Sequence, residues 1–358
     1  MIYDIPTPCV LIDNGALERN LRTMQDRCDQ TGTSLWPHCK THKMVPVLKR
    51  QLALGAAGAT VAKIGEAEAL LPSGVRNIFI AHSIVRPDAA PRLKALDAHL
   101  DRLILAVTSE AQLESLEKVL DLAGISAGAL LSVDTGLTRE GARTPESAAH
   151  LAGRIRESKH LTLSGIYTHE GHAYQLTPPE MIPFVEGIHR KLLEFRDAVG
   201  GGLPLWPGCS ITAMLFAGRE AVEVVRPGSY VFGDLSLCES APILPWEDAA
   251  LNILATVIDL PEPGLALIDA GSKVFSSDRS AAGIFGRGRD HKHLTVSRLS
   301  EEHGFVTWVD GPSPAIGDVL HFIPAHVCPV VNLASEVHVF EGTEYIETWR
   351  VDGRGRST

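Results

Sequence analysis

The sequence predicts an α/β fold, in which an eight-stranded β/α barrel of the TIM type is followed by an all-β domain. Apolar runs of strand length alternate with amphipathic stretches of helix length through most of the chain. Eight such strands fall between residues 14 and 240, a number and length typical of a β/α barrel. Beyond Ala241 the helical pattern stops, and short apolar runs broken by glycine and proline follow.

The barrel elements begin with a helix predicted from Asn14, a good N-cap residue, to about Asp29. The predicted strands are Ser34–Cys39, Gly58–Ala62, Asn77–His82, Arg102–Val107, Gly128–Val133, Leu161–Thr168, Leu203–Trp206 and Val222–Arg226. Helix-like stretches such as Glu110–Leu122 and Pro145–Glu157 separate them. A doubly wound open sheet is the alternative, but no G-x-G-x-x-G motif follows the first strand.

The second domain is expected to span residues 241–358, after a barrel of residues 14–240. Its predicted strands are Leu251–Leu260, Leu265–Asp269, Leu294–Leu299, Gly304–Val309, Asp318–Ile323 and Glu336–Phe340. The segment 1–13 contains an apolar strand at Thr7–Asp13 that precedes the first barrel helix. We therefore expect this N-terminal strand to join the β domain.

Composition excludes several classes of function. The 358-residue chain carries a formal net charge of −10 and no basic run, which argues against a nucleic-acid partner. No apolar stretch of about 18 residues predicts a membrane span, and no signal peptide is visible at the start. The six cysteines form no C-x-x-C pair, so we expect a reducing, cytoplasmic setting.

The stretch Trp36-Pro-His-Cys-Lys-Thr-His-Lys43 is the first candidate for chemistry. Alternate side chains of a strand share a face, which would place Trp36, His38 and Lys40 together. A lysine at a strand's C-terminal end, in a partly desolvated site, can act as a nucleophilic amine. Taken alone, the stretch is equally compatible with a solvated basic loop.

Polar clusters also follow the other predicted strands, where active sites of β/α barrels lie. They are His82, Val133-Asp-Thr-Gly-Leu-Thr-Arg139, Tyr167-Thr-His-Glu-Gly-His172, Pro207-Gly-Cys-Ser210 and Arg226-Pro-Gly-Ser-Tyr230. The last two loops offer backbone N–H groups that can approach a phosphate. A nucleophilic lysine and a phosphate cradle together suggest pyridoxal 5′-phosphate held as a Schiff base. Each cluster alone has a structural explanation, such as a surface ion pair for Arg139.

Five motifs resemble the D-threonine aldolase and D-serine dehydratase family, in the same order and over nearly the whole chain. They are Pro37-His-Cys-Lys-Thr-His-Lys43, Tyr167-Thr-His-Glu-Gly-His172, Arg226-Pro-Gly-Ser-Tyr230, Asp269-Ala-Gly-Ser-Lys273 and Pro324-Ala-His-Val-Cys-Pro329. The resemblance implies the alanine-racemase type of fold, a fold-type III pyridoxal-phosphate barrel with a β domain. It also implies a homodimer with active sites near the interface.

The resemblance implies a role for each matching residue. Lys40 matches the Schiff-base lysine, Arg139 the arginine near the cofactor's phenolic oxygen, and Tyr167 the tyrosine beside the pyridine ring. The phosphate-binding loops would contain Gly208, Ser210, Gly228, Ser229 and Tyr230. One departure is the loop Gly208-Cys-Ser-Ile-Thr212, where the family commonly has Gly-Ser-Thr-Pro-Thr.

His326 and Cys328 match the pair of residues that binds a divalent metal in that family. They are two apart on a strand-like segment, so their side chains should share a face. Imidazole and thiolate suit Zn²⁺, with Mn²⁺ or another divalent ion as the alternative. Without the resemblance, a buried cysteine beside a hydrogen-bonded histidine is a plausible structural explanation.

These residues predict a pyridoxal-phosphate- and metal-dependent lyase that cleaves D-β-hydroxy amino acids, such as D-threonine to glycine and acetaldehyde. His169 and His172 are candidates for proton transfer, because histidine titrates near neutral pH. A dehydratase that yields a 2-oxo acid and ammonia uses the same groups, and its pattern is slightly favoured by Cys328. An amino-acid racemase and a non-catalytic pyridoxal-phosphate carrier are further alternatives. His82 and Arg143 are candidates for the substrate's distal pocket.

Overall fold

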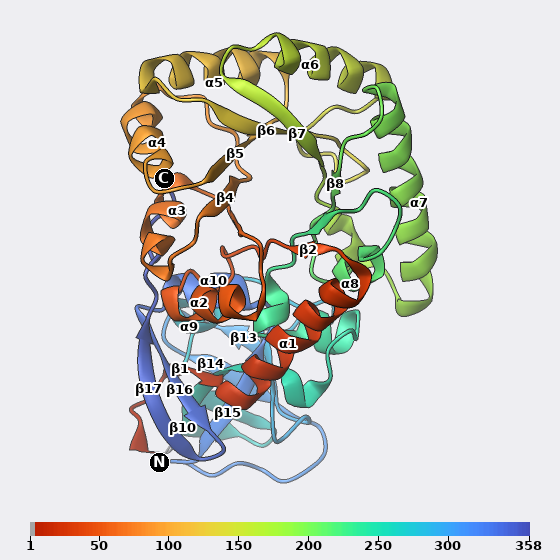
Figure 1. Cartoon of the computed structure of the whole chain (residues 1–358). Helices are drawn as coiled ribbons and strands as arrows, with labels where there is room; N and C mark the ends of the chain where they lie inside the picture. The colour runs from red at the N-terminus through yellow and green to blue at the C-terminus, as the bar shows by residue number, and fades with distance from the viewer. Residues whose placement is uncertain (1–3) are drawn as a thin grey trace. The chain divides into compact units, whose positions relative to one another are not determined.

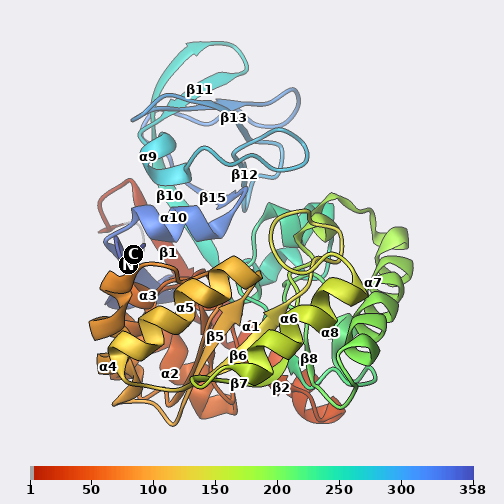
Figure 2. The same ribbon diagram turned by 90° about the horizontal axis from the view of Figure 1, so that it is seen from above.

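The computed structural model describes residues 4–358, which form two compact units. The barrel unit comprises Thr23–Lys40, Val45–Gly228 and Gly355–Thr358, and the β unit comprises residues 4–22, 41–44 and 229–354. Residues 1–3 of the predicted N-terminal segment lie outside the described residues. Within residues 4–358, no helix has the length and apolar character that a membrane crossing requires. Figures 1 and 2 show the chain from two directions.

Parallel strands form the centre of the barrel unit. They are β2 (Ser34–Leu35), β3 (Ala59–Val61), β4 (Asn77–Ile80), β5 (Arg102–Val107), β6 (Ala127–Ser132), β7 (Leu161–Tyr167), β8 (Leu205–Trp206) and β9 (Val224–Val225). Among the described residues, β3 to β8 form one six-stranded sheet in chain order, and β2 pairs with β9. Isolated parallel bridges, His38 to Thr60 and Leu205 to Val222, connect the two sheets. This order lacks the reversal that defines a doubly wound sheet.

Helices cover the outer side of these strands. Figure 1 shows α3 (Ile64–Leu70), α4 (Ala90–Asp97), α5 (Glu110–Ala123), α6 (Pro145–Glu157) and α7 (Pro178–Ala198) outside the ring of β3 to β8. The other helices are α1 (Asn14–Thr31), α2 (Val45–Leu54) and α8 (Ala213–Phe216). The helix α5 shows ordinary capping at both ends. The Ser109 side chain caps the N-terminus of α5, and Gly124 with a φ of 66° ends it.

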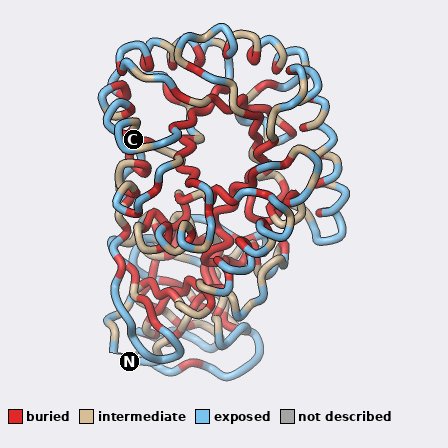
Figure 3. Tube along the Cα trace, in the orientation of Figure 1, coloured by how far each residue is buried: buried red, intermediate tan, exposed pale blue. Residues whose placement is uncertain are grey.

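Aromatic side chains fill the interior of the barrel unit. Trp36 and Trp206 meet edge to face with ring centroids 4.9 Å apart, and Phe79 and Tyr167 do so at 5.1 Å. All four rings are buried in one apolar cluster. Figure 3 shows that burial follows the inner strands and one side of each surrounding helix.

The β unit is built on one sheet that is nine-stranded among residues 4–358, with the order β11-β14-β13-β12-β15-β10-β1-β16-β17. Its strands are β1 (Cys9–Asp13), β10 (Leu251–Glu262), β11 (Leu265–Ile268), β12 (Gly286–Gly288), β13 (Thr295–Leu299), β14 (Gly304–Thr307), β15 (Val319–Pro324), β16 (Glu336–Glu341) and β17 (Glu344–Arg350). The N-terminal strand β1 lies between β10 and β16. Two short helices, α9 (Ser272–Phe275) and α10 (Val327–Leu333), accompany the sheet.

The fold prediction is confirmed as an α/β unit with parallel strands followed by an antiparallel β unit. The strands β2 and β9 are shorter than predicted, in part because Pro37 and Pro227 lack the N–H that a regular ladder needs. The sequence missed β12 and β17. Gly286–Gly288 has no apolar signal, and six of the seven residues of Glu344–Arg350 are exposed. The domain limits of 14–240 and 241–358 stay a prediction.

The last described residues, Gly355–Thr358, pack on the barrel unit. The carbonyl of Thr358 accepts hydrogen bonds from the backbone N–H of Gly65 at 2.8 Å and from Arg92 at 3.2 Å. A side chain at position 65 would meet this segment, since a Cβ there would lie 3.0 Å from the Arg356 carbonyl oxygen. Gly65 therefore permits the close approach.

Replacing Phe79 tests the role of the aromatic core. Phe79→Ala removes a fully buried ring that contacts Tyr167 and Trp206. It should lower the free energy of unfolding by about 3–5 kcal/mol, because it leaves a cavity that the barrel cannot refill. Urea denaturation followed by circular dichroism measures this loss. Leu122→Ala is the control, since Leu122 on α5 is 65% exposed and should cost no more than about 0.5 kcal/mol. Equal losses would contradict a packed core at Phe79.

Candidate active site

Lys40 lies in a turn directly after the inner strand segment and is half-buried. The backbone before it is fixed on both sides, because His38 N donates to the Pro227 carbonyl and Cys39 N to the Thr60 carbonyl, both at 2.8 Å. The strand β2 itself ends at Leu35, so the face predicted for Trp36, His38 and Lys40 does not belong to one regular strand. Lys40 is nevertheless placed at the carboxyl edge of the parallel strands.

His169 is half-buried in the barrel unit, and its Nδ1 hydrogen-bonds to the Gly208 carbonyl. Burial, followed by the positive charge of Lys40, lowers the pKa of His169 to about 3. Its imidazole is therefore neutral over the ordinary pH range. This pKa lies below the neutral range expected for an ordinary histidine, because a charged imidazole would be desolvated beside a lysine. The role of His169 in proton transfer stays a prediction.

His172 lies on a short 3₁₀ segment, Gly171–Gln175, and its neighbours differ from those of His169. Its ring packs edge to face on Phe184 at 4.8 Å, and its buried Nδ1 has no hydrogen-bond partner within residues 4–358. Burial and the charge of Lys191 lower the pKa of His172. The sequence therefore paired two histidines that the structure places in different surroundings.

A small cavity brings together Arg139, Tyr167 and His169. Arg139 is 55% exposed and lies 3.6 Å from the Glu140 carboxylate. Tyr167 is buried on the barrel interior, where desolvation raises the pKa of its hydroxyl to about 12. The cavity therefore combines an exposed cation, a neutral phenol and a neutral imidazole.

Arg226 is a buried charge whose importance the sequence did not reveal. Its guanidinium donates to the carbonyls of Thr168 at 2.6 Å and Trp206 at 3.1 Å. The guanidinium carbon lies 5.2 Å from the centroid of the Tyr167 ring. Burial lowers the pKa of Arg226 to about 10. A Cβ at position 208 would lie 2.5 Å from this guanidinium, which explains the glycine there.

Glu170 is a second buried charge that the sequence did not single out. Its carboxylate accepts hydrogen bonds from Thr212 Oγ1 at 2.6 Å and from Gly208 N at 3.2 Å. Burial raises the pKa of this carboxyl group. Through these two bonds Glu170 fixes the loop Gly208–Thr212, in which Cys209 and Ile211 are also buried.

The loops after β8 and β9 are joined by a hydrogen bond from Gly228 N to Ser210 Oγ at 2.9 Å. Ser229 and Tyr230 follow Gly228 in the chain and are buried in a 3₁₀ turn. The two loops thus bring hydroxyl groups and backbone N–H groups close together. Such donors are the groups that bind a phosphate. Together with Lys40 and the cavity at Tyr167, these residues fit pyridoxal phosphate.

The predicted metal ligands lie in the β unit. His326 is the N-cap residue of α10 and Cys328 lies in its first turn, so the prediction of a strand there is wrong. His326 Nδ1 is 2.7 Å from the Asp278 carboxylate, and Thr41 Oγ1 is 3.2 Å from Cys328 Sγ. Burial alone would lower the pKa of His326. The charge and hydrogen bond of Cys328, with the Asp234 and Asp278 carboxylates, outweigh it and raise the pKa to about 10.

These contacts fit a metal held by few protein ligands. An anionic sulfur and an imidazole attract one another, and the Asp278 carboxylate orients the ring. Within residues 4–358, no group of three or more histidine, cysteine or acidic side chains is placed to hold a metal. A metal at this pair would therefore keep positions for water and substrate, as catalytic zinc sites do.

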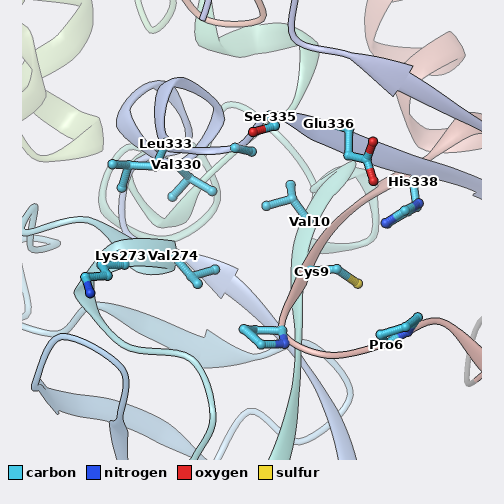
Figure 4. Close-up of a pocket in the computed structure, with 12 residues that line it drawn as sticks. Pro6, Cys9, Val10, Lys273, Val274, Val330, Leu333, Ser335, Glu336 and His338 are labelled. Carbon is cyan, nitrogen blue, oxygen red and sulfur yellow. The ribbon is translucent and has the colours of Figure 1, made fainter. Parts of the chain in front are cut away.

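Another cavity, of about 420 Å³, lies in the β unit beside α10. Neither His326 nor Cys328 lines it. Figure 4 shows Val330 and Leu333 of α10 on one side and Val10 and Cys9 of β1 on the other. The charged group of Lys273 at its edge is paired with Glu301 and Glu302. Its lining mixes aliphatic side chains with charged and polar ones, among them Glu336 and His338, and we assign it no catalytic residue.

His82 and Arg143 were both expected to line the distal pocket of the substrate. The structure places these two residues in different surroundings. Arg143 is 70% exposed, and its nearest carboxylate, that of Asp134, is 3.9 Å away. His82 lies on the barrel unit with its Nε2 3.2 Å from Lys63 Nζ.

Comparison with known proteins agrees with this arrangement. Residues 12–236 match the family model of the alanine racemase N-terminal domain, and residues 250–340 match that of the putative serine dehydratase domain. D-threo-3-hydroxyaspartate dehydratase from Delftia sp. (strain HT23) is 30% identical, with 97% of each chain covered. Both family models together account for most of the chain.

Two solved structures extend the comparison. The crystal structure of D-threonine aldolase from Filomicrobium marinum aligns with a TM-score of 0.90 at 25% identity, covering 100% of this chain and 98% of that one. A cysteine-to-alanine mutant of D-threo-3-hydroxyaspartate dehydratase in the metal-free form aligns with a TM-score of 0.87 at 27% identity, covering 98% of both chains. The chain therefore belongs to the D-threonine aldolase and D-serine dehydratase family, which joins an alanine-racemase-like domain to a serine dehydratase domain.

Proposed function

We propose that this protein is a pyridoxal-phosphate- and divalent-metal-dependent lyase that cleaves D-β-hydroxy amino acids by a retro-aldol reaction. The observation that carries the proposal is the placement of Lys40 at the carboxyl edge of parallel strands, with its charge acting on the half-buried His169 of the same unit. Relatives named as an aldolase and as a dehydratase of 3-hydroxy amino acids support the reaction class. Dehydration to a 2-oxo acid and ammonia is the second candidate, favoured by the 30% identity to a dehydratase.

The barrel unit would hold the cofactor through its own residues. Lys40 would provide the covalent attachment, and Gly208, Ser210 and Gly228 would bind the phosphate, followed in the chain by Ser229 and Tyr230. Arg139 would neutralise the phenolic oxygen, and Tyr167 would lie against the ring. Pyridoxal phosphate, when bound, delocalises the negative charge left on the substrate's α-carbon. We also infer that all eight parallel strands act as one closed barrel, which the bridges at His38 and Leu205 support.

The neutral state of His169 limits what it can do in the reaction. With a pKa of about 3, its imidazole does not carry a proton at neutral pH and is a weak base. Its Nδ1 is fixed on the Gly208 carbonyl, so its Nε2 acts as a hydrogen-bond acceptor with a set direction. We therefore assign His169 to orienting a donor group, and Lys40 to moving the proton. His172 stays a weaker candidate.

His326 and Cys328 would hold the metal, for which imidazole and thiolate favour Zn²⁺ over Mn²⁺. A bound divalent ion supplies a Lewis acid for the substrate's β-hydroxyl. Asp278 keeps His326 Nδ1 engaged at 2.7 Å, which leaves Nε2 as the metal-binding atom. The homodimer and the cytoplasmic location expected from the sequence stay predictions.

Product analysis tests the proposed reaction. With pyridoxal phosphate and Zn²⁺ or Mn²⁺ supplied, D-threonine should yield glycine and acetaldehyde in equal amounts, measured by amino-acid analysis and an alcohol dehydrogenase assay. Formation of 2-oxobutanoate and ammonia instead would establish the dehydratase. L-threonine is the control, because one face of the substrate must meet Lys40. Equal turnover of both enantiomers would contradict the proposed site.

Metal affinity tests the role of Asp278 without using activity. Asp278→Asn should weaken Zn²⁺ binding by about 10- to 100-fold, because it removes the carboxylate that orients His326. Competition with a chromophoric chelator measures the dissociation constant. Asp290→Asn is a matched control, since Asp290 also faces a histidine, His321, at 3.9 Å. Undiminished affinity in both Asp278→Asn and Cys328→Ala would remove this pair from the metal site.

A further inference from the structure

A pocket of about 410 Å³ lies in the barrel unit at the carboxyl ends of β3 and β4. Its walls are largely aliphatic, with Ile64, Ile80 and Ile84 among them. The carboxyl ends of parallel strands share one edge, and Cys39 N is hydrogen-bonded to Thr60 of β3 at 2.8 Å. The pocket therefore opens on the same edge as Lys40.

The positive charges that line this pocket are not equivalent. Arg86 is paired with Asp88 at 3.1 Å and Arg92 with Glu68 at 2.7 Å, so both are neutralised locally. Lys63 has no carboxylate within ion-pair distance among residues 4–358, and its Nζ contacts His82 Nε2 at 3.2 Å. One positive charge in the pocket thus lacks a protein counter-ion.

The contacts of His82 fix the direction of hydrogen bonding at Lys63. His82 Nδ1 is 3.1 Å from the Ser83 carbonyl, which can only accept, so Nδ1 carries the proton. Nε2 is then an acceptor and takes one hydrogen from the Lys63 ammonium. Two N–H donors of Lys63 stay available to a ligand.

We infer that Lys63, oriented by His82, binds a carboxylate on the β substituent of the substrate, and that the preferred substrates are dicarboxylic 3-hydroxy-D-amino acids. This inference rests on the proposed function and names its substrate class. A single ammonium matches a monoanionic carboxylate, and the aliphatic walls accept the carbon chain that carries it. Asp88 also lines the pocket, but its carboxylate is paired with Arg86.

Substrate discrimination tests the inference. The measured quantity is the ratio of kcat/KM for D-threo-3-hydroxyaspartate to kcat/KM for D-threonine. Lys63→Met should lower this ratio about tenfold or more, because a charge-assisted hydrogen bond to the distal carboxylate is lost. Lys63→Arg should restore most of it. An unchanged ratio in Lys63→Met would overturn the inference.

Arg86→Met is the matched control, because it also removes a cation from the pocket wall. Arg86 is exposed and already paired with Asp88, so the ratio should change by no more than about twofold. A loss in Arg86→Met as large as in Lys63→Met would mean that general electrostatics, and not a built subsite, sets the preference.

A binding measurement separates this inference from the proposed function. Butyrate supplies one carboxylate on a short aliphatic chain, and butyramide is its neutral isostere. In an NMR titration of the whole protein, butyrate should bind wild type more tightly than Lys63→Met, while butyramide should not distinguish them. This result would support the subsite even if neither amino acid were turned over. Equal butyrate binding by both proteins would reject the subsite even if the lyase activity were established.

Discussion

Two buried charges, Glu170 and Arg226, set the geometry on which the candidate cofactor site depends. Burying an ion costs free energy unless hydrogen bonds replace its water. Arg226 obtains them from the carbonyls of Thr168 and Trp206, and Glu170 from Thr212 and Gly208 N. These bonds join the segments at the ends of β7, β8 and β9, so a loop that moved would leave a buried polar group without its partners. The residues proposed to bind the phosphate therefore lie on loops that are held in place by the protein's own hydrogen bonds.

The same constraint explains why the loop after β8 tolerates an unusual sequence. Cys209 and Ile211 turn inward and are buried, so they contribute packing. The polar positions that hold the loop are Gly208, Ser210 and Thr212, and each is hydrogen-bonded to Glu170 or Gly228. A substitution at Cys209 or Ile211 would change how the loop packs. It would leave the hydrogen bonds of Gly208, Ser210 and Thr212 in place.

A short segment after Lys40 shows how the chain serves two sites. Lys40 belongs to the barrel unit, whereas Thr41 to Met44 pack within the β unit. There Thr41 Oγ1 contacts Cys328 at 3.2 Å, and Lys43 Nζ donates to Asn332 at 2.8 Å. One peptide bond thus separates the proposed cofactor lysine from a residue that contacts a proposed metal ligand. The positive φ of Lys43, 52°, marks the tight turn that this requires.

The sequence predicted what periodicity and motif spacing encode. The parallel strands, the helix Pro145–Glu157 and the antiparallel unit follow from local patterns of apolar residues. Glu170, Arg226 and Asp278 were missed because their importance comes from burial and from partners 42, 58 and 48 residues away in the chain. The same reason explains why the lowered pKa of His169 was not foreseen, since burial and Lys40 cause it and neither effect is visible in the local sequence. Lys63 gave no signal at all, since only the structure shows that it lacks a counter-ion.

The identity of the cofactor lysine is the most direct test of this account. Borohydride reduction of the holoprotein should fix the pyridoxyl group on one lysine, which peptide mapping by mass spectrometry locates. The account predicts the label on Lys40, because Lys43 is buried with its amine bound to Asn332. A label on Lys43 or on any other lysine, or the absence of a reducible visible band, would contradict it.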